Sequence, residues 1–295
     1  MSSSGLNPIV ADNYNEIDQP IKKTIDFLDD FERGLYVKLS HQIKGFRPEI
    51  EFSPSPTYVR GSLETVLLPN SNSKVKISVS NEQQLDLEIN SLVPPFKDVN
   101  AKIYVNTATN RLQSGALPTI IGNISRRCGK YSAEAKATNK NDGLIGFSFL
   151  RNIDHHWSAG LEAYYKNVQK SGGASLAVRY IGRPIYNQKF QVCGTYNLMG
   201  DLALSFHTLL LSESIGVATR FRLNTNSLES NCEVGLSMAY DINFAKRNFP
   251  VVVNFRTSNR LAHGANIEFS HGNAKLNIST IIQDKKPEFG IKLCI

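Results

Sequence analysis

From Gly34 to the last residue of this chain, apolar side chains alternate with polar ones at a period of two. Val75, Ile77 and Val79 are typical, because a lysine or a serine separates each from the next. Alternation of this kind puts successive side chains on opposite faces of a β-strand. Turn clusters such as His271-Gly272-Asn273 separate the runs. The pattern therefore predicts an all-β body.

The number and length of these runs favour a membrane barrel over a soluble sandwich. Residues 35–295 number 261, and about 19 runs share them, so a strand with its turn takes about 13.7 residues. Transmembrane β-strands need about 9 to 11 residues plus a turn, whereas soluble sandwiches show a turn signal roughly every 8 to 12. Two stretches can be divided differently, so the count lies between about seventeen and twenty. The predicted strands are centred near residues 38, 50, 63, 77, 87, 104, 122, 134, 147, 161, 177, 193, 206, 219, 235, 253, 267, 279 and 291.

Alternation alone does not decide which face of the strands meets water. Aromatic residues near predicted strand ends, at Trp157, Tyr164/Tyr165, Tyr180 and Tyr240, match the girdles that flank the lipid-facing band of a membrane barrel. The polar face is rich in serine, threonine and asparagine, as a watery lumen requires. No apolar run is long enough for a spanning helix. We predict a membrane-spanning β-barrel, with a soluble all-β binding module as the alternative.

The first 34 residues differ from the rest in charge and in period. They carry seven acidic and three basic residues, a net of −4, so the other 261 carry 30 basic and 19 acidic residues, a net of +11. Four apolar residues follow helical spacing: Ile21, Ile25, Leu28 and Phe31. Asp18 is placed to cap such a helix, Pro20 falls in its first turn, and Gly34 ends it. We predict an N-terminal extension at 1–34 with an amphipathic helix of about 13 residues, in or at the lumen of a barrel at 35–295.

The C-terminal residues resemble the β-signal by which barrels of the mitochondrial outer membrane are recognised for assembly. The resemblance rests on a polar residue, a glycine two places later and two further hydrophobic residues: Glu288, Gly290, Leu293 and Ile295. A terminal strand that pairs with the exposed edge of an assembly factor explains such a signal. With an odd strand count the first and last strands run parallel, so 35–40 is expected to pair with 289–293. The segment before Lys22 has no secretory signal pattern.

An acidic amphipathic helix, about nineteen strands and a terminal β-signal together resemble the mitochondrial porin superfamily. Two passages are similar to its protein-translocase branch, the pore subunit of the outer-membrane translocase (the TOM channel): Phe31-Glu32-Arg33-Gly34, and the hairpin 157–165 with a turn at 171–173 and a return strand 174–180. The Gly-Leu-Lys triplet typical of the voltage-dependent anion channel does not occur.

This resemblance implies a protein-conducting channel in the outer membrane of mitochondria or of a reduced mitochondrion-like organelle. Its implied partners are precursor proteins with presequences, small tail-anchored translocase subunits and receptors, the lipid bilayer, and further copies of the chain. The alternative within the same superfamily is a voltage-dependent anion and metabolite channel.

If the apolar positions face lipid, the charged residues of the strands face the lumen. The acidic candidates gather on the early strands and would bind basic presequences: Glu49, Glu51, Glu64, Asp86 and Glu88. A basic stretch without an inward acid follows later in the chain: Arg179, Arg220 and Arg222. The other interpretation is ordinary solvation of the pore with local ion pairing. Both remain open, and weak multiple contacts would suit a passenger in transit.

The remaining residues favour no enzyme, cofactor, metal site or nucleic-acid partner. His155 and His156 are adjacent, so they point to opposite faces of a strand and have no partner at ligand spacing. The four cysteines at 128, 193, 232 and 294 form no metal or disulfide pattern. No nucleophile elbow or phosphate-binding loop occurs, and the basic residues are dispersed rather than clustered.

Overall fold

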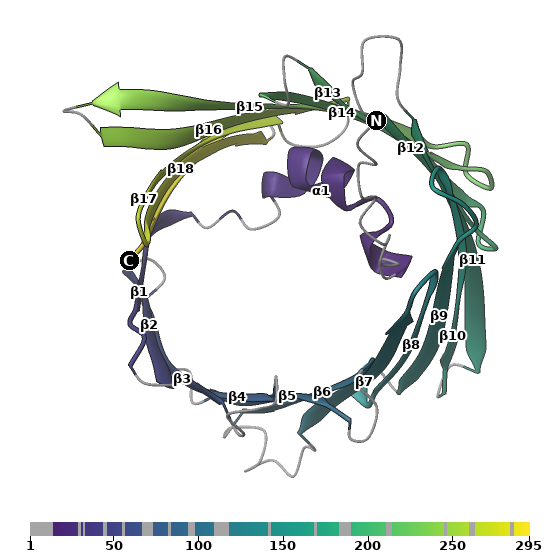
Figure 1. The fold of residues 1–295 in the computed structure, drawn as a ribbon, viewed down its shortest axis with the longest axis horizontal. Coiled ribbons are helices and arrows are strands. Elements are labelled where there is room, and N and C mark those ends of the chain that lie inside the picture. Colours follow the sequence, from purple (N-terminus) through teal and green to yellow (C-terminus); the bar gives the residue numbers. More distant parts are fainter. Residues whose placement is uncertain are drawn as a thin grey trace, which may run out of the picture.

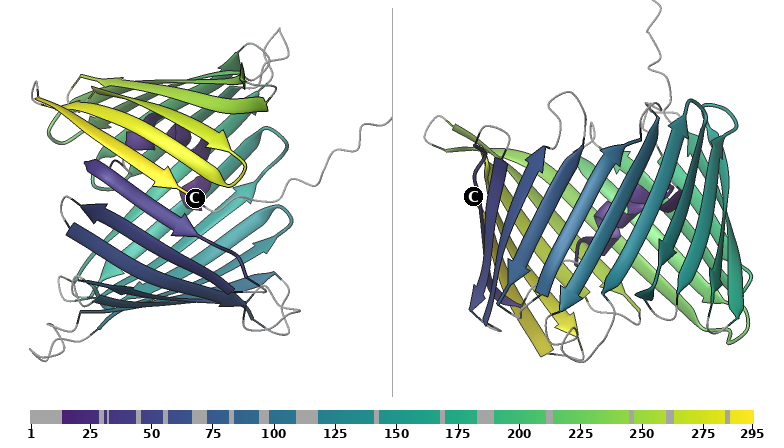
Figure 2. Two further views of the ribbon diagram at one scale, coloured as in Figure 1. Left: turned by 90° about the vertical axis from the view of Figure 1, so that its left-hand side faces the viewer. Right: turned by 90° about the horizontal axis from the view of Figure 1, so that it is seen from below.

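The computed structural model describes residues 14–28, 31, 33–43, 46–54, 57–66, 73–81, 84–93, 98–108, 118–140, 143–167, 170–182, 190–210, 214–244, 247–259, 263–283 and 286–295. These residues form one sheet of 19 strands, closed around a lumen that holds a short helix (Figures 1 and 2). Within these ranges, no helix has the length and hydrophobicity to cross a membrane.

The elements follow one another in the order of the chain. The helical ones are η1 (Tyr14–Glu16), α1 (Gln19–Ile25) and η2 (Asp26–Leu28). The strands are β1 (Gly34–Ser40), β2 (Phe46–Pro54), β3 (Thr57–Val66), β4 (Lys74–Ser80), β5 (Gln84–Leu92), β6 (Val99–Ala108), β7 (Thr119–Cys128), β8 (Tyr131–Thr138), β9 (Leu144–Asn152), β10 (Trp157–Lys166), β11 (Ser171–Gly182), β12 (Phe190–Asn197), β13 (Asp201–Leu210), β14 (Ile215–Asn224), β15 (Ser230–Phe244), β16 (Arg247–Ser258), β17 (His263–His271), β18 (Ala274–Gln283) and β19 (Lys286–Cys294).

Each strand pairs antiparallel with the next, and β1 closes the barrel by pairing parallel with β19. Gly34 lies opposite Gly290 in this seam. Beyond it, the Ser40 N–H donates to the Ile295 carbonyl at 2.6 Å, and the Ile295 N–H donates to the Lys38 carbonyl at 2.9 Å. The predicted membrane-type barrel of 19 strands is confirmed, and every predicted strand centre falls inside the corresponding strand.

The two faces of the sheet can be assigned from the helix. Residues directly opposite each other on neighbouring strands point to the same face of the sheet. One side chain that contacts the enclosed helix therefore identifies the lumenal face of every strand. Arg220 of β14 hydrogen-bonds to Asp26 at the C-terminal end of the helix. It lies opposite Ser205 on β13 and Glu233 on β15. Followed from strand to strand, this register puts the polar residues inside.

The outer face carries the large apolar side chains that alternate with them. Leu35, Ile77, Ile145 and Leu176 are among the exposed hydrophobic residues. In water such a continuous apolar surface would be costly to expose, whereas a bilayer covers it. Alternation therefore positions the lipid-facing band without any buried core of the soluble kind.

Aromatic rings form a row at one end of the outer wall. The ring centroids of Trp157 and Tyr180 lie 4.7 Å apart, and those of Tyr180 and Phe190 5.8 Å apart. This matches the predicted girdle, with one correction. Tyr164 faces the lumen while Tyr165 faces outward, because neighbouring residues of a strand point to opposite faces.

The N-terminal helix is shorter than predicted. It covers Gln19–Ile25 with a 3₁₀ turn on either side, and Phe31 lies outside it. Asp18 makes no capping hydrogen bond with its side chain, because its carboxylate pairs with Lys22 at 2.8 Å. The helix ends where the carboxylate of Asp26 turns to the barrel wall. Four of the seven acidic residues of the N-terminal extension lie outside the described residues: Asp12, Asp29, Asp30 and Glu32.

The turn predicted at Ser171-Gly172-Gly173 is wrong, because these residues begin β11. The chain turns earlier, at Lys170, whose φ of 45° is left-handed. Gly173 is needed in the strand for a different reason: a Cβ there would lie 2.5 Å from the hydroxyl oxygen of Tyr164, so the glycine makes room for the tyrosine ring on the facing strand.

Candidate functional site: the lumen and its docked helix

The N-terminal segment lies in the lumen against the wall formed by β9–β17 (Figure 1). The first described residue of the segment is Tyr14, whose hydroxyl hydrogen-bonds to the hydroxyl of Ser175 at 2.7 Å. The ring of Tyr14 lies over Gly160, where an added Cβ would come within 2.8 Å of the ring and 2.7 Å of a backbone oxygen. Burial raises the pKa of the Tyr14 phenol above its ordinary value. Glu16 reaches the neighbouring wall and pairs with Arg127 at 3.2 Å.

The middle of the segment buries its apolar side and anchors its backbone. The carbonyl of Ile17 accepts hydrogen bonds from Gln191 at 2.8 Å and from the Cys193 thiol at 3.3 Å. Ile21 and Ile25 have no exposed surface and pack with Cys193 and its neighbours on the wall. The predicted helical stripe is therefore real at these two positions. The side chain of Leu28, the third member, lies outside the described residues.

The end of the helix is fixed by a buried charge network. The Arg220 guanidinium donates to both carboxylate oxygens of Asp26 and, through Nε, to Glu233 at 2.6 Å. Glu233 has no exposed surface and also accepts from Arg256 at 3.0 Å. A fully buried carboxylate is stable only when its neighbours neutralise it, so this cluster depends on both arginines. Beside it, the carbonyl oxygen of Thr24 lies 2.6 Å from the position of an added Cβ on Gly235.

Sequence reasoning placed Arg220 and Glu233 in the lumen but did not predict that they pair. Asp26 was assigned to a helix face other than the apolar one, and its contact with Arg220 was not predicted. Arg222 is brought near the same network, 3.9 Å from Glu233. Arg179 is separate: it lies buried on β11 and donates to Ser158 at 3.1 Å.

The five predicted acidic residues face the lumen on neighbouring strands, but each is paired with a base. Glu49 is almost fully buried, and it binds Lys76 at 2.6 Å and Lys38 at 3.1 Å. Lys38 also contacts Glu51 at 3.2 Å. The remaining contacts are Glu64 with Lys74 at 2.8 Å, Asp86 with Arg60 at 2.6 Å, and Glu88 with Lys102 at 2.8 Å. The structure therefore brings the acids together as a surface of alternating charge.

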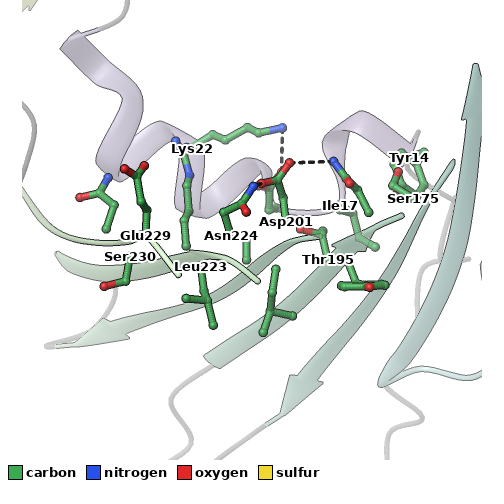
Figure 3. A pocket seen from close by; sticks show the side chains of 17 residues that line it. Tyr14, Ile17, Lys22, Ser175, Thr195, Asp201, Leu223, Asn224, Glu229 and Ser230 are labelled. Atoms are coloured by element: carbon green, nitrogen blue, oxygen red, sulfur yellow. Dashed lines mark hydrogen bonds and ion pairs between the residues drawn. The ribbon is translucent and has the colours of Figure 1, made fainter. Parts of the chain in front are cut away.

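A cavity of about 550 Å³ lies between the helix and the wall (Figure 3). The helix contributes the ion pair of Asp18 with Lys22 to its lining. The wall contributes Asp201, which accepts hydrogen bonds from Asn197 at 3.0 Å and Asn224 at 2.7 Å. Among the described residues, no three or more His, Cys, Asp and Glu side chains are grouped so as to hold a metal ion.

The four residues of the predicted β-signal lie in or just after β19. Gly290 faces the lumen opposite Gly34 in the seam and Ser279 on β18, while Leu293 lies opposite Val37. The carboxylate of Glu288 is 3.5 Å from Arg33. Their use in assembly is not something that geometry tests, and it stays a prediction.

A closed barrel with an apolar outer wall, a polar lumen and a helix docked inside defines a membrane-spanning β-barrel protein of the porin type. A family model described as eukaryotic porin matches residues 24–290. The chain belongs to this family, and the predicted superfamily is confirmed. It is a β-barrel protein of the mitochondrial outer membrane. Eukaryotic porins are channel and structural proteins rather than enzymes.

Two relatives carry the name Mitochondrial distribution and morphology protein 10. The one from Pyricularia oryzae is 34% identical over 110 residues, which cover 36% of this chain and 24% of the relative. The one from Podospora anserina is 36% identical over 112 residues, 37% of this chain and 25% of the relative. The matched stretches thus span about a quarter of these proteins. Neither relative is named as a translocase pore.

Proposed function

We propose that the chain forms a polar pore of the mitochondrial outer membrane through which unfolded precursor proteins pass. The observation that carries the proposal is the paired-charge wall of β1–β8, which helix α1 does not pack against and which the N-terminal segment meets through Glu16 at Arg127 (Figure 1). Its six inward acids are Glu49, Glu51, Glu64, Asp86, Glu88 and Glu134, and its eight inward bases are Lys38, Arg47, Arg60, Lys74, Lys76, Lys102, Arg127 and Lys136.

A wall of this kind suits an extended passenger. A basic side chain of a presequence can replace a wall lysine at a carboxylate such as Glu88, whose pair with Lys102 is partly exposed. Exposed ion pairs contribute only about 0 to 1 kcal/mol, so the exchange is nearly neutral and each contact is brief. Weak contacts at many sites allow a chain to enter and also to leave. The precursor, the tail-anchored subunits and receptors, and a homo-oligomeric assembly are the partners that this proposal includes.

A voltage-dependent anion or metabolite channel is the second candidate. Its support is the net charge of +7 and the arginines of the helix-bearing wall, Arg220 and Arg222. An anion channel needs an excess of cations along its path. On β1–β8 the six inward acids offset most of the eight inward bases, which supports the precursor channel instead.

A role in the distribution and shape of mitochondria is the third candidate, and the names of the two relatives favour it. Such a role requires the barrel to bind other proteins and does not require a passenger. Deletion of the protein distinguishes the precursor pore from the morphology role. Loss of precursor import within one generation supports the pore, whereas altered organelle shape with normal import supports the morphology role.

The pore itself is tested by single-channel recording in a planar bilayer with a basic amphipathic peptide. Glu49, Glu51, Asp86 and Glu88 are changed together to the neutral amides, which leaves Lys38, Lys76, Arg60 and Lys102 without their acidic partners. We expect weaker block by the peptide, most clearly at low salt because salt screens the attraction.

The matched control changes Glu268 to Gln, which removes a lumenal ion pair with Lys275 on β17 and β18, outside the β1–β8 wall. It is expected to leave the block unchanged. Unchanged peptide block in the quadruple variant, together with a shift toward chloride selectivity, would overturn the precursor channel in favour of the anion channel.

A further inference from the structure

The hairpin of β15 and β16 extends past the barrel (Figure 1). The two strands stay paired to their tip, where Phe244 lies opposite Arg247. The neighbours stop earlier: β14 pairs with β15 only as far as Met238, and β17 pairs with β16 only from Val251. Residues 239–244 of β15 and 247–250 of β16 therefore form a two-stranded ribbon, and the six residues of β15 extend roughly 20 Å past its last pair with β14.

The backbone groups along the outer edge of β15 can be identified from the hydrogen-bond pattern. In an antiparallel sheet the N–H and C=O of successive residues point to alternate sides. Cys232 bonds with Asn259 on the β16 side, and the Ala239 N–H donates to Ser214 on the β14 side at 2.8 Å. Continuing this alternation, Asp241 and Asn243 direct their backbone groups to the outer edge. No described residue pairs with them there.

The two edges of the ribbon are not equivalent. Pro250 lies at a position of β16 that faces away from β15, so that edge lacks an N–H donor, a common protection against strand pairing. The β15 edge has no proline. Tyr240 and Ile242 are 48% and 41% exposed on its outer face, and the carboxylate-bearing Asp241 is exposed on the other face.

The ribbon also lies at the end of the barrel that carries the aromatic row. Trp157 begins β10, and Tyr180 lies near the end of β11 at the same rim at which β15 ends. Interfacial aromatic residues mark the level of the lipid headgroups. The ribbon extends sideways past the wall at the level of this rim (Figures 1 and 2), where it can meet a protein bound at the membrane surface.

We propose that the β15 edge at residues 239–244 is a docking site for an extended segment of a partner protein, which adds to the sheet as a further strand. Main-chain hydrogen bonds to Asp241 and Asn243 hold the segment. Its side chains follow the chemistry of the edge, with apolar residues beside Tyr240 and Ile242 and a lysine or arginine on the face of Asp241. The proposal is independent of what passes through the lumen.

The probe is a labelled peptide, Val-Thr-Val-Lys-Val-Thr-Val, added to the purified full chain in nanodiscs, with binding read by fluorescence anisotropy. Its analogue with Glu in place of Lys is expected to bind about three- to five-fold more weakly. This factor corresponds to the free energy that one cross-strand charge pair contributes. Asp241→Lys is expected to reverse this preference. Glu229→Lys makes the same charge change in an exposed turn at the other end of the barrel and is expected to leave it unaltered.

Backbone pairing is tested with two N-methylated peptides. Methylation of alternate amides on one edge blocks the hydrogen bonds to β15 and is expected to abolish binding, whereas methylation on the opposite edge leaves it intact. Equal binding of both peptides, or no effect of the charge at position 241, would overturn the proposal. Copies of the chain that cross-link through Ile242→Cys, in a background without the native cysteines, would assign the edge to self-pairing and would also overturn it.

Discussion

Asp26, the residue that ends helix α1, accepts hydrogen bonds on both carboxylate oxygens from Arg220 of β14, 194 positions later in the chain. The contact joins the N-terminal segment to a wall that is otherwise complete without it. Glu233 supports Arg220 from the other side. Release of the helix would therefore leave one partner of the buried guanidinium in place, which makes undocking less costly than breaking an isolated buried pair.

Asp26→Ala is expected to loosen the docked segment. Loss of a charge-assisted hydrogen-bond pair costs about 2 kcal/mol, which corresponds to about a 30-fold rise in the undocked fraction. Hydrogen exchange of amides 19–25, followed by mass spectrometry, measures this directly. Asp18→Ala, which removes only the exposed pair with Lys22, is the control. Equal exchange in the two variants would contradict the anchoring role.

Gly235 is expected to be intolerant of any side chain, because its Cβ would meet the Thr24 carbonyl at 2.6 Å. Gly235→Ala forces the helix away from the wall, at a cost of about 1 to 3 kcal/mol for overpacking. The matched control is Gly122→Ala, since nothing lies within 4 Å of a Cβ at that position. Thermal unfolding in detergent, together with exchange of the helix amides, is the measurement. Unaltered protection of the helix in Gly235→Ala would show that the close approach is dispensable.

The parallel seam predicts a specific cross-link. Val37 and Leu293 lie opposite each other on the outer face of β1 and β19. In a chain whose native cysteines are replaced, cysteines at these two positions are expected to form an intramolecular disulfide, because paired Cα atoms fall within the usual range of about 4.4 to 6.8 Å. Cysteines at Val37 and Phe289, four residues out of register, are expected not to react. Cross-linking of both pairs alike would contradict the register.

Simultaneous replacement of Gly290 and Leu293 is expected to leave the chain synthesised but unassembled. Both lie in the strand that closes the barrel, so the change removes the terminal strand as a pairing partner. Native gels of isolated mitochondria report assembly. The control is Ile291→Leu, which keeps the volume of an outward side chain between them. Normal assembly of the double variant would exclude this strand as the assembly signal.

The turn before β10 is expected to be sensitive to acid. The Asp154 carboxylate accepts hydrogen bonds from the backbone N–H groups of Trp157 and His156, which lowers its pKa below the ordinary value of 3.8. A lowered folded-state pKa means that the stabilisation is present above the unfolded value and is lost as pH falls through the folded one. Fluorescence of Trp157, the single tryptophan, should therefore change below about pH 4. Asp154→Ala should already show the acid form at neutral pH and lose the transition.

The strands were predictable because each carries its own signal. A period of two is local and repeats nineteen times, so a misplaced boundary at one strand does not disturb the next. The helix was less predictable because its length depends on a distant contact. Spacing alone extends the apolar stripe to Phe31, but Arg220 draws Asp26 to the wall and the helix stops at Ile25.

The charged residues of the lumen were likewise predictable only in part. That Glu49 and Lys76 face inward follows from alternation. That they contact each other at 2.6 Å depends on the register of three strands, which no local pattern specifies. The sequence therefore indicated which charged residues line the lumen, whereas their pairing required the structure.

The parallel seam has a mechanical consequence. Five residue pairs join β1 to β19 and four join β1 to β2, whereas ten join β10 to β11 and β13 to β14. Parallel pairing is also slightly less stable per residue than antiparallel pairing. Under heat, lateral tension or the pull of an inserting strand, the sheet would therefore open first beside β1, whose two junctions are the shortest of the barrel.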